Sequence, residues 1–282
     1  MNKKHFAVIG HPIGHTMSPF IHKRLFELSG VDAEYDILNI SPTNLSTAYS
    51  SLKELDGYNI TLPHKRTILP FLDSLSRKAN LYGSVNTVKN EESSKGYTTD
   101  PDGFLRALEH AQIPLQGKVV ILGTGGVARV MAYESALAGC DTVIAVRPSD
   151  LSAAASLAGE ILTRVIAPQI KTCTIESIEG PIDLLVNATP VGMYPKVHET
   201  PVPSDIVAQC EAVFDAVYNP METLLQKTAR SLGAKTVGGI SMLVWQAVVS
   251  HEVWDGSLYS KKDVETLCCD AVDEMKRLFP EE

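Results

Sequence analysis

The sequence predicts an α/β fold built from two domains. Short apolar runs alternate along the chain with longer segments of helical periodicity, a pattern typical of parallel strands joined by helices. The alternation begins at Phe6–Ile9 and begins again at Lys118–Leu122. The chain has 282 residues, and at about 100–200 residues per domain this length suits two domains.

The first part of the chain contains three expected strands and two expected helix starts. The strands are expected at residues 6–9, 35–40 and 58–61. Ser18-Pro19 predicts a helix start, with Ser18 as the N-cap and Pro19 at the first helical position. Ser41-Pro42 predicts a second start, for a helix that runs to about Leu55.

The middle of the chain has the pattern of a second parallel sheet. Gly123-Thr124-Gly125-Gly126 leads from the first of its strands into a helix that ends near Gly139, and Ser149-Asp150 is expected to cap the next helix. The nearly all-apolar first strand indicates a sheet covered on both faces. The expected strands are residues 118–122, 142–146, 182–186, 212–217 and 235–237.

The last part of the chain is predicted to be helical. One helix is expected from Ser241 to about Trp254. Ser260 and Asp263 have the spacing of a capping box and predict a second helix, which ends at Leu278. These helices are too short to form a domain, so we expect them to pack back on the N-terminal domain.

Composition and charge argue against several classes of protein. Hydrophobic residues make up 44% and charged residues 21% of the chain, and the net charge is −8. No Lys/Arg-rich run is present, so binding to nucleic acid or to a membrane surface is not expected. No apolar segment suits a secretion signal or a transmembrane helix. The five cysteines lack metal-ligand spacing, which predicts free thiols in the cytoplasm and no metal site.

The glycine turn has the context of a dinucleotide site. Gly123-x-Gly125-x-x-Ala128 follows a strand and opens a helix. The first glycine permits the tight turn, the second lets the backbone approach a pyrophosphate, and Ala128 allows close packing of helix on strand. A tight turn with only a structural role is the alternative.

The end of the next strand bears on the choice of dinucleotide. An NAD site usually has Asp or Glu there, on the ribose 2′-hydroxyl, whereas this strand ends in Val146-Arg147. The Arg147 guanidinium suits a 2′-phosphate, which favours NADP. A solvated surface arginine is the alternative.

Several separated segments together resemble the shikimate dehydrogenase family. They occur in the order of that family's motifs, from residue 10 to about residue 256. The matching segments are GHPIGHTMSPFIH (10–22), NITLPHK (59–65), GSVNT (83–87), Thr99-Asp100-x-x-Gly103, the glycine turn, NATPVGM (187–193), VYNPxxTxL (217–225) and GxxMLxxQ (239–246).

The resemblance implies an enzyme that reduces 3-dehydroshikimate to shikimate with NADPH, with NAD also possible. It implies two domains around a cleft. The substrate-binding catalytic domain would comprise residues 1–103 and 240–282, and a Rossmann-type NADP-binding domain would comprise residues 104–239. We expect a small-molecule substrate, a monomer or homodimer as the oligomeric state, and the cytoplasm as the compartment.

The resemblance also implies the roles of individual residues. Lys65 would transfer the proton at the reacting oxygen, and Asp100 would orient and assist it. Residues that would contact substrate are Thr16, Ser18, Asn59, Thr61, Asn86, Tyr218 and Gln246. Residues that would bind the cofactor are Gly123, Thr124, Gly125, Gly126, Val127, Arg147, Thr189, Ala216 and Gly239. Asp102 is expected to cap a helix that opens at Gly103-Phe104-Leu105, because the family's spacing selects Asp100 for catalysis.

Departures from the family pattern leave alternatives open. Thr16 stands where the family commonly has serine, and Leu151 stands where a second basic residue is common. Asp150 adds a negative charge beside Arg147. A quinate/shikimate dehydrogenase able to use NAD is therefore the nearest alternative. A non-catalytic nucleotide sensor on the same fold is disfavoured, because Lys65 and Asp100 are both present.

Overall fold

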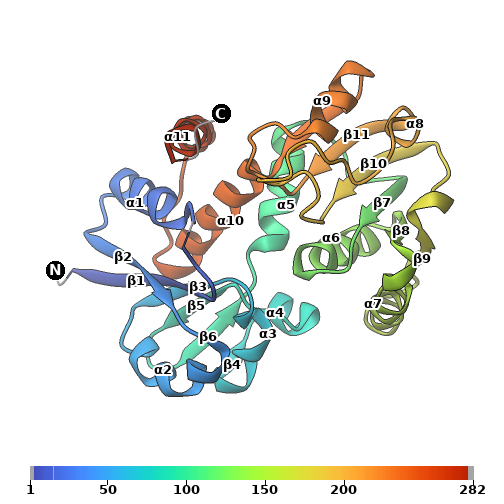
Figure 1. Ribbon diagram of the computed structural model, residues 1–282. Helices are drawn as coiled ribbons and strands as arrows, with labels where there is room; N and C mark the ends of the chain where they lie inside the picture. Colours follow the sequence, from blue (N-terminus) through green and yellow to red (C-terminus); the bar gives the residue numbers. More distant parts are fainter. Residues whose placement is uncertain (1–2, 15, 279–282) are drawn as a thin grey trace. The chain divides into compact units, whose positions relative to one another are not determined.

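The fold is α/β, as the sequence predicts (Figure 1). The structure, a computed structural model, describes residues 3–14 and 16–278, so His15 of the first motif lies outside the described residues. The chain divides into two compact units. We call residues 1–103 with 244–282 unit 1, and residues 104–243 unit 2.

Unit 1 is built on a mixed sheet whose described strands run in the order β2-β1-β3-β5-β6-β4. The strands are β1 (Lys4–Gly10), β2 (Ala33–Asn39), β3 (Gly57–Ile60), β4 (Ser74–Leu75), β5 (Thr87–Asn90) and β6 (Ser94–Tyr97). The first three are parallel and confirm the predicted strands. The prediction missed β4 and the antiparallel β5–β6 hairpin, because these strands are short and mostly polar.

The helices of unit 1 begin slightly differently from the prediction. They are α1 (Ser18–Ser29), the 3₁₀ turn η1 (Pro42–Asn44), α2 (Leu45–Leu52), α3 (His64–Thr67), the 3₁₀ turn η2 (Leu69–Phe71) and α4 (Arg77–Tyr82). Ser18 is the first helical residue and Met17 the N-cap. The Ser18 hydroxyl accepts from Thr16 Oγ1 (3.1 Å) and makes no cap bond. The predicted second helix begins with η1 and ends at Leu52, not Leu55.

The two C-terminal helices, α10 (Gly239–Trp254) and α11 (Lys261–Leu278), confirm the prediction. The capping box is present: the Ser260 hydroxyl donates to Asp263 Oδ2 (2.6 Å), and the Asp263 amide donates to Ser260 Oγ (3.2 Å). Arg24 of α1 donates to Asp270 of α11 (2.8 Å). Trp254 Nε1 donates to the Val88 carbonyl oxygen of β5 (2.9 Å), so the end of α10 is fixed on the unit 1 sheet.

A buried pair of histidines joins α1 to α10. His22 Nδ1 lies 3.0 Å from His251 Nε2, and neither residue is exposed. Tyr259 donates its hydroxyl to the Leu25 carbonyl oxygen (3.1 Å) and therefore accepts from His251 Nδ1, 2.9 Å away. His251 Nε2 is then the acceptor for His22 Nδ1–H, so this network assigns the His251 imidazole as neutral and places a proton on His22 Nδ1.

Acid is expected to destabilise the protein through this pair. Burial lowers the pKa of His22 well below its usual value and the pKa of His251 to about 4, so the unfolded chain binds protons that the folded chain excludes. The free energy of unfolding is therefore highest above about pH 6.5, and it decreases as the pH falls toward about 4. For His251 we expect a loss of about 2 kcal/mol between pH 7 and pH 5, measured by urea unfolding. His251→Gln should flatten this dependence, and an unchanged pH dependence would contradict the assignment.

Unit 2 is built on a parallel sheet whose described strands run in the order β12-β11-β10-β7-β8-β9. The strands are β7 (Lys118–Leu122), β8 (Asp141–Val146), β9 (Gln169–Thr174), β10 (Ile182–Asn187), β11 (Cys210–Asp215) and β12 (Lys235–Gly238). The prediction missed β9, an edge strand with no continuous apolar run, and extended β11 two residues too far. Val120, Leu185 and Val213 are fully buried in the core on this sheet.

The remaining elements are α5 (Asp100–His110), α6 (Gly126–Leu137), η3 (Pro148–Asp150), α7 (Leu151–Arg164), η4 (Ile175–Ser177), α8 (Ser204–Val207) and α9 (Leu224–Ser231). The predicted cap at Asp102 is wrong, because α5 already begins at Asp100; Asp102 lies in its first turn and accepts from Lys78 Nζ (2.6 Å). Asp150 is the N-cap of α7 but makes no side-chain cap bond. Among the described helices, none is long and apolar enough to cross a membrane.

Candidate active site

A lysine–aspartate ion pair lies in unit 1. Lys65 Nζ donates to Asp100 Oδ2 at 2.6 Å, and the two side chains are only 19% and 11% exposed. Lys65 sits in the single-turn helix α3, which follows β3. The helix is held by His64, whose Nε2 lies 2.6 Å from the Ile40 carbonyl oxygen. The lysine is therefore fixed just beyond the carboxyl end of a strand, where open α/β sheets bind ligands.

Asp100 is positioned by the start of α5. The Thr99 carbonyl oxygen accepts from the Gly103 amide (2.9 Å), so the helix begins at this point. The positive end of the helix dipole favours the Asp100 carboxylate. Asn86 binds both residues: its Oδ1 accepts from the Thr99 amide (2.7 Å), and its Nδ2 donates to Asp100 Oδ1 (2.9 Å). One Asp100 oxygen thus faces Lys65 and the other faces Asn86.

The predicted amide residues of unit 1 come together around this pair. Asn86 Nδ2 also donates to Gln246 Oε1 of α10 (3.3 Å). Asn59 is 5% exposed, and its Nδ2 donates to the Asn86 carbonyl oxygen (3.2 Å). We call the whole group the polar cluster; it comprises Lys65, Asp100, Asn86, Thr99, Gln246, Asn59, Thr87 and Ser250.

The hydrogen-bonding groups of Asn59 point inward. Its Oδ1 accepts from the Tyr35 hydroxyl (2.7 Å), while its Nδ2 lies within hydrogen-bond distance of Thr87 Oγ1 and Ser250 Oγ (3.1 Å each). Sequence reasoning missed Tyr35, Thr87, Thr99 and Ser250 as members of this network. Thr87 and Thr99 lie inside the family-like motifs, and Ser250 lies one helical turn after Gln246; these were the available signals.

Thr16, Ser18 and Thr61 also lie in unit 1. The Ser18 amide donates to Thr16 Oγ1 (3.2 Å), so the two side chains form a local turn at the start of α1. Ser18 is also hydrogen-bonded to Tyr35, and this bond only partly offsets the burial that raises the pKa of the Tyr35 phenol well above its usual value. Thr61 follows β3, and its methyl group would lie 2.6 Å from a Cβ at Gly10, so that position requires glycine.

The glycine turn of unit 2 leads from β7 into α6. Gly123 has a φ of +104°, and a Cβ there would lie 3.1 Å from Thr189 Cγ2. Gly125 is the N-cap of α6 and has no side chain to bond the first amides of the helix. A Cβ at Gly125 or Gly126 would meet nothing within 4 Å, so the space beside these two α-carbons is open. The first amide groups of α6 are therefore available to an anion.

A buried network shapes the neighbouring strand ends. Asn187 Oδ1 accepts from the Thr189 amide (3.1 Å) and hydroxyl (2.7 Å), and its Nδ2 donates to Asp215 Oδ1 (2.9 Å). Asp215 Oδ2 accepts from Thr223 (2.6 Å). Burial raises the pKa of Asp215 to about 6 against these hydrogen bonds. The network fixes Thr189 beside the glycine turn, at the point between β7 and β10 where the strand order reverses.

The segments after β11 and β12 belong to the same edge of the sheet. A Cβ at Gly239 would lie 2.2 Å from the Ala216 carbonyl oxygen, so this close approach requires glycine. The Gly239 amide donates to the Val217 carbonyl oxygen (3.2 Å). Tyr218 follows directly, and burial raises the pKa of its phenol. Ala216, Tyr218 and Gly239 therefore lie close to one another within unit 2.

Arg147 lies just beyond β8 and is 76% exposed at its side chain. Its Nε and Nη2 donate to Asp150 Oδ2 at 3.0 and 2.8 Å. The guanidinium is therefore exposed to solvent and already paired with a carboxylate. The described residues contain no group of three or more His, Cys, Asp or Glu side chains able to hold a metal ion.

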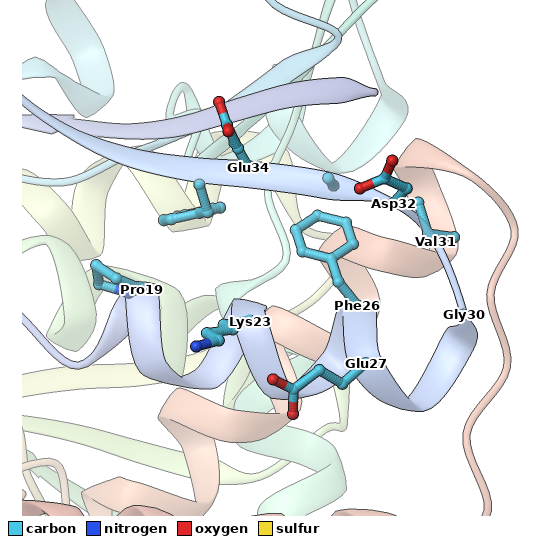
Figure 2. A pocket seen from close by; sticks show the side chains of 10 residues that line it. Pro19, Lys23, Phe26, Glu27, Gly30, Val31, Asp32 and Glu34 are labelled. Carbon is cyan, nitrogen blue, oxygen red and sulfur yellow. The ribbon is translucent and has the colours of Figure 1, made fainter. Parts of the chain in front are cut away.

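A separate groove in unit 1 has a volume of about 550 Å³. Figure 2 shows the side chains that line it. It runs between α1 and the edge strand β2, with Lys23 and Glu27 on the helix side. Lys65 and Asp100 do not line it. The groove is therefore not the candidate active site.

Comparison with known proteins identifies the family. The model of the shikimate dehydrogenase substrate binding domain matches residues 8–88. A shikimate dehydrogenase (NADP(+)) of Caldanaerobacter subterraneus subsp. tengcongensis is 37% identical to this chain, and the aligned region covers 92% of this chain and 94% of that protein. The shikimate 5-dehydrogenase of Thermus thermophilus, solved with NADP(H) and shikimate, has a TM-score of 0.85 and 32% identity over 95% of this chain and 99% of that one. The enzyme of Listeria monocytogenes, solved with shikimate and NAD, has a TM-score of 0.84 and 30% identity over 98% and 96%. The chain therefore belongs to the shikimate dehydrogenase family.

Proposed function

We propose that the protein is an NADP-dependent shikimate dehydrogenase, which reversibly reduces 3-dehydroshikimate to shikimate in the biosynthesis of chorismate and aromatic amino acids. The observation that carries this proposal is the Lys65–Asp100 pair at 2.6 Å, braced by Asn86 in a chain of this family. A charged, positioned proton donor is what ketone reduction requires. The direct test is NADP reduction with shikimate, followed by the absorbance of the reduced nicotinamide.

Lys65 and Asp100 would have different roles at the reacting oxygen. When bound, NADPH supplies the hydride that reduces the keto carbon. Negative charge then develops on the keto oxygen, and Lys65 Nζ donates a proton to it. Asp100 keeps the lysine in place through one carboxylate oxygen. In the oxidation of shikimate, the neutral Lys65 amine accepts the hydroxyl proton.

The substrate is a small polyol carboxylate, and the proposed contacts follow its two kinds of substituent. Thr16 and Ser18, with Tyr218, are assigned to the carboxylate. Asn86 and Gln246 are assigned to ring hydroxyls, and Thr61 lies on the segment that leads to Lys65. The partners of Asn59 favour a supporting role beneath these residues over a direct contact.

The cofactor contacts are proposed for unit 2. The pyrophosphate would lie on the glycine turn, formed by Gly123, Thr124, Gly125, Gly126 and Val127. It would accept from the amides at the start of α6, since the Gly123 amide donates to the Ala145 carbonyl oxygen (3.2 Å). Thr189, Ala216 and Gly239 lie at the same edge of the sheet and would line the remainder of the cofactor. Arg147 would hold the 2′-phosphate.

Arg147→Ala is expected to raise KM for NADP about tenfold and to leave KM for NAD nearly unchanged. A charge-assisted contact to phosphate gives a preference of roughly 10–150-fold, and we expect the low end because Asp150 already binds the guanidinium. Steady-state rates with both cofactors provide the measurement. Arg230→Ala is the matched control, since Arg230 is another exposed arginine of unit 2 and pairs with Glu222. Equal losses with both cofactors would remove Arg147 from the 2′-phosphate site.

The second candidate is a quinate/shikimate dehydrogenase that also uses NAD. The pairing of Arg147 with Asp150 favours it, since it weakens the charge available to a 2′-phosphate. A matrix of shikimate and quinate with NADP and NAD separates the two candidates. Comparable kcat/KM for NAD and NADP, with turnover of quinate, would support the second.

We propose the cytoplasm as the compartment, and a monomer or homodimer as the oligomeric state. The five cysteines are all free thiols, which supports a reducing compartment. Light scattering of the purified protein distinguishes monomer from dimer.

A further inference from the structure

Ser250 is a buried polar residue that the proposed reaction does not use. It lies on α10, one helical turn after Gln246, and is not exposed. Its hydroxyl donates to the Gln246 carbonyl oxygen at 3.0 Å. A serine that bonds only to its own helix would be unremarkable in this position. Ser250, however, also has partners on two strands.

The Ser250 hydroxyl joins α10 to β3 and to the start of β5. Asn59 Nδ2 donates to Ser250 Oγ at 3.1 Å, and Thr87 Oγ1 lies 2.9 Å from it. The one Ser250 proton is therefore shared between Thr87 Oγ1 and the Gln246 carbonyl oxygen, and the Thr87 proton remains for Asn86. Asn59 is 5% exposed and Thr87 is fully buried. In a site closed to water, the loss of one partner leaves the other polar groups without a hydrogen bond, because no water can replace it.

These partners lead directly to the proton-transfer pair. The Thr87 hydroxyl donates to Asn86 Oδ1 (3.2 Å), and Asn86 Nδ2 donates to Asp100 Oδ1 (2.9 Å) and to Gln246 Oε1 (3.3 Å). Asp100 in turn holds Lys65. Ser250 therefore contacts Thr87, which is hydrogen-bonded to Asn86, and also the backbone of Gln246.

We infer that Ser250 is a positioning residue of the active site, which sets Asn86 and Gln246 for the substrate and aligns Asp100 with Lys65. This inference rests on the proposed function, because it concerns the same site. Ser250 touches none of the reacting groups and acts through Thr87, Asn59 and the backbone of Gln246. Its removal affects the polar cluster of unit 1, whereas the glycine turn belongs to unit 2 and takes part in none of these three hydrogen bonds of Ser250.

The test compares Ser250→Ala with Ser135→Ala in steady-state kinetics. Ser135 is a matched control: it is fully buried on α6, and its hydroxyl donates to the Met131 carbonyl oxygen one turn earlier (2.8 Å). For Ser250→Ala we expect kcat/KM for shikimate to fall about tenfold, with KM for NADP within about twofold of wild type. Ser135→Ala should leave kcat/KM for shikimate within about twofold of wild type.

A double-mutant cycle separates positioning from general loosening of the fold. Thr87→Val removes the partner hydroxyl, and the double variant Thr87→Val/Ser250→Ala should lose little more kcat/KM than the worse single variant, because both act through one network. If Ser250→Ala does not fold, Ser250→Cys is measured against the same criteria, since it keeps the shape and weakens the hydrogen bond.

Three results would overturn the inference: an unchanged kcat/KM for shikimate in a folded Ser250 variant, equal losses toward shikimate and NADP, or fully additive effects in the cycle. A wild-type protein that fails to oxidise shikimate would instead overturn the proposed function. The wild-type assay therefore distinguishes the two failures.

Discussion

Replacing Lys65 with alanine is expected to lower kcat for shikimate oxidation about 10²–10⁴-fold, the usual range for a lost general acid–base. The side chain is mostly enclosed and makes a 2.6 Å bond to Asp100, so the substitution removes a proton donor that is held in one position. The substitution removes a side chain from a single-turn helix that His64 still anchors, so the fold should persist. Stopped-flow or steady-state rates and a thermal unfolding curve provide the two measurements.

Lys78→Ala is the matched control for this prediction. Lys78 is another unit 1 lysine, with a 2.6 Å bond to Asp102, but it is 44% exposed and lies outside the polar cluster. Its loss should leave kcat near the wild-type value. A Lys65→Ala protein that keeps most of its kcat would show that Lys65 is not the proton-transfer group.

Asp100→Asn is expected to lower kcat about 10²-fold and to raise KM for shikimate. The new amide has to turn its N–H₂ either toward the Lys65 ammonium or toward Asn86 Nδ2, and both of these are donors. Either orientation leaves a donor facing a donor in a site that is almost closed to solvent, so Lys65 loses its fixed position.

Asp102→Asn serves as the control, since Asp102 is a second carboxylate in the first turn of α5 and accepts from the exposed Lys78 instead of Lys65. Kinetic constants for the two variants are compared under the same conditions. Equal effects of the two substitutions would mean that the charge at the start of α5, and not the contact with Lys65, matters.

The fold was predictable where the pattern of apolar residues was strong. The buried strands β1 and β7 contain continuous apolar runs, and the Ser260–Asp263 capping box uses contacts within four residues of the chain. The β5–β6 hairpin was missed because its residues Thr87–Asn90 and Ser94–Tyr97 are mostly polar. Their place in the sheet depends on pairing with β3, which a local pattern does not reveal.

The candidate site was also only partly predictable from the sequence. Lys65, Asp100, Asn86 and Gln246 were found from motifs, and the structure brings them together in unit 1. The inward bonds of Asn59 were not predictable, because its partners Tyr35 and Ser250 are 24 and 191 residues away in the chain. The pairing of Arg147 with Asp150 was partly visible in their spacing, since Asp150 is the third residue after Arg147.

Initial rates of the wild-type protein with shikimate and quinate, each with NADP and with NAD, test the assigned activity. Shikimate with NADP is expected to have the highest kcat/KM of the four combinations. Lys65→Ala is expected to abolish nearly all of that rate without unfolding the protein. If a folded wild-type protein reduces neither nicotinamide with shikimate, the protein is not a shikimate dehydrogenase.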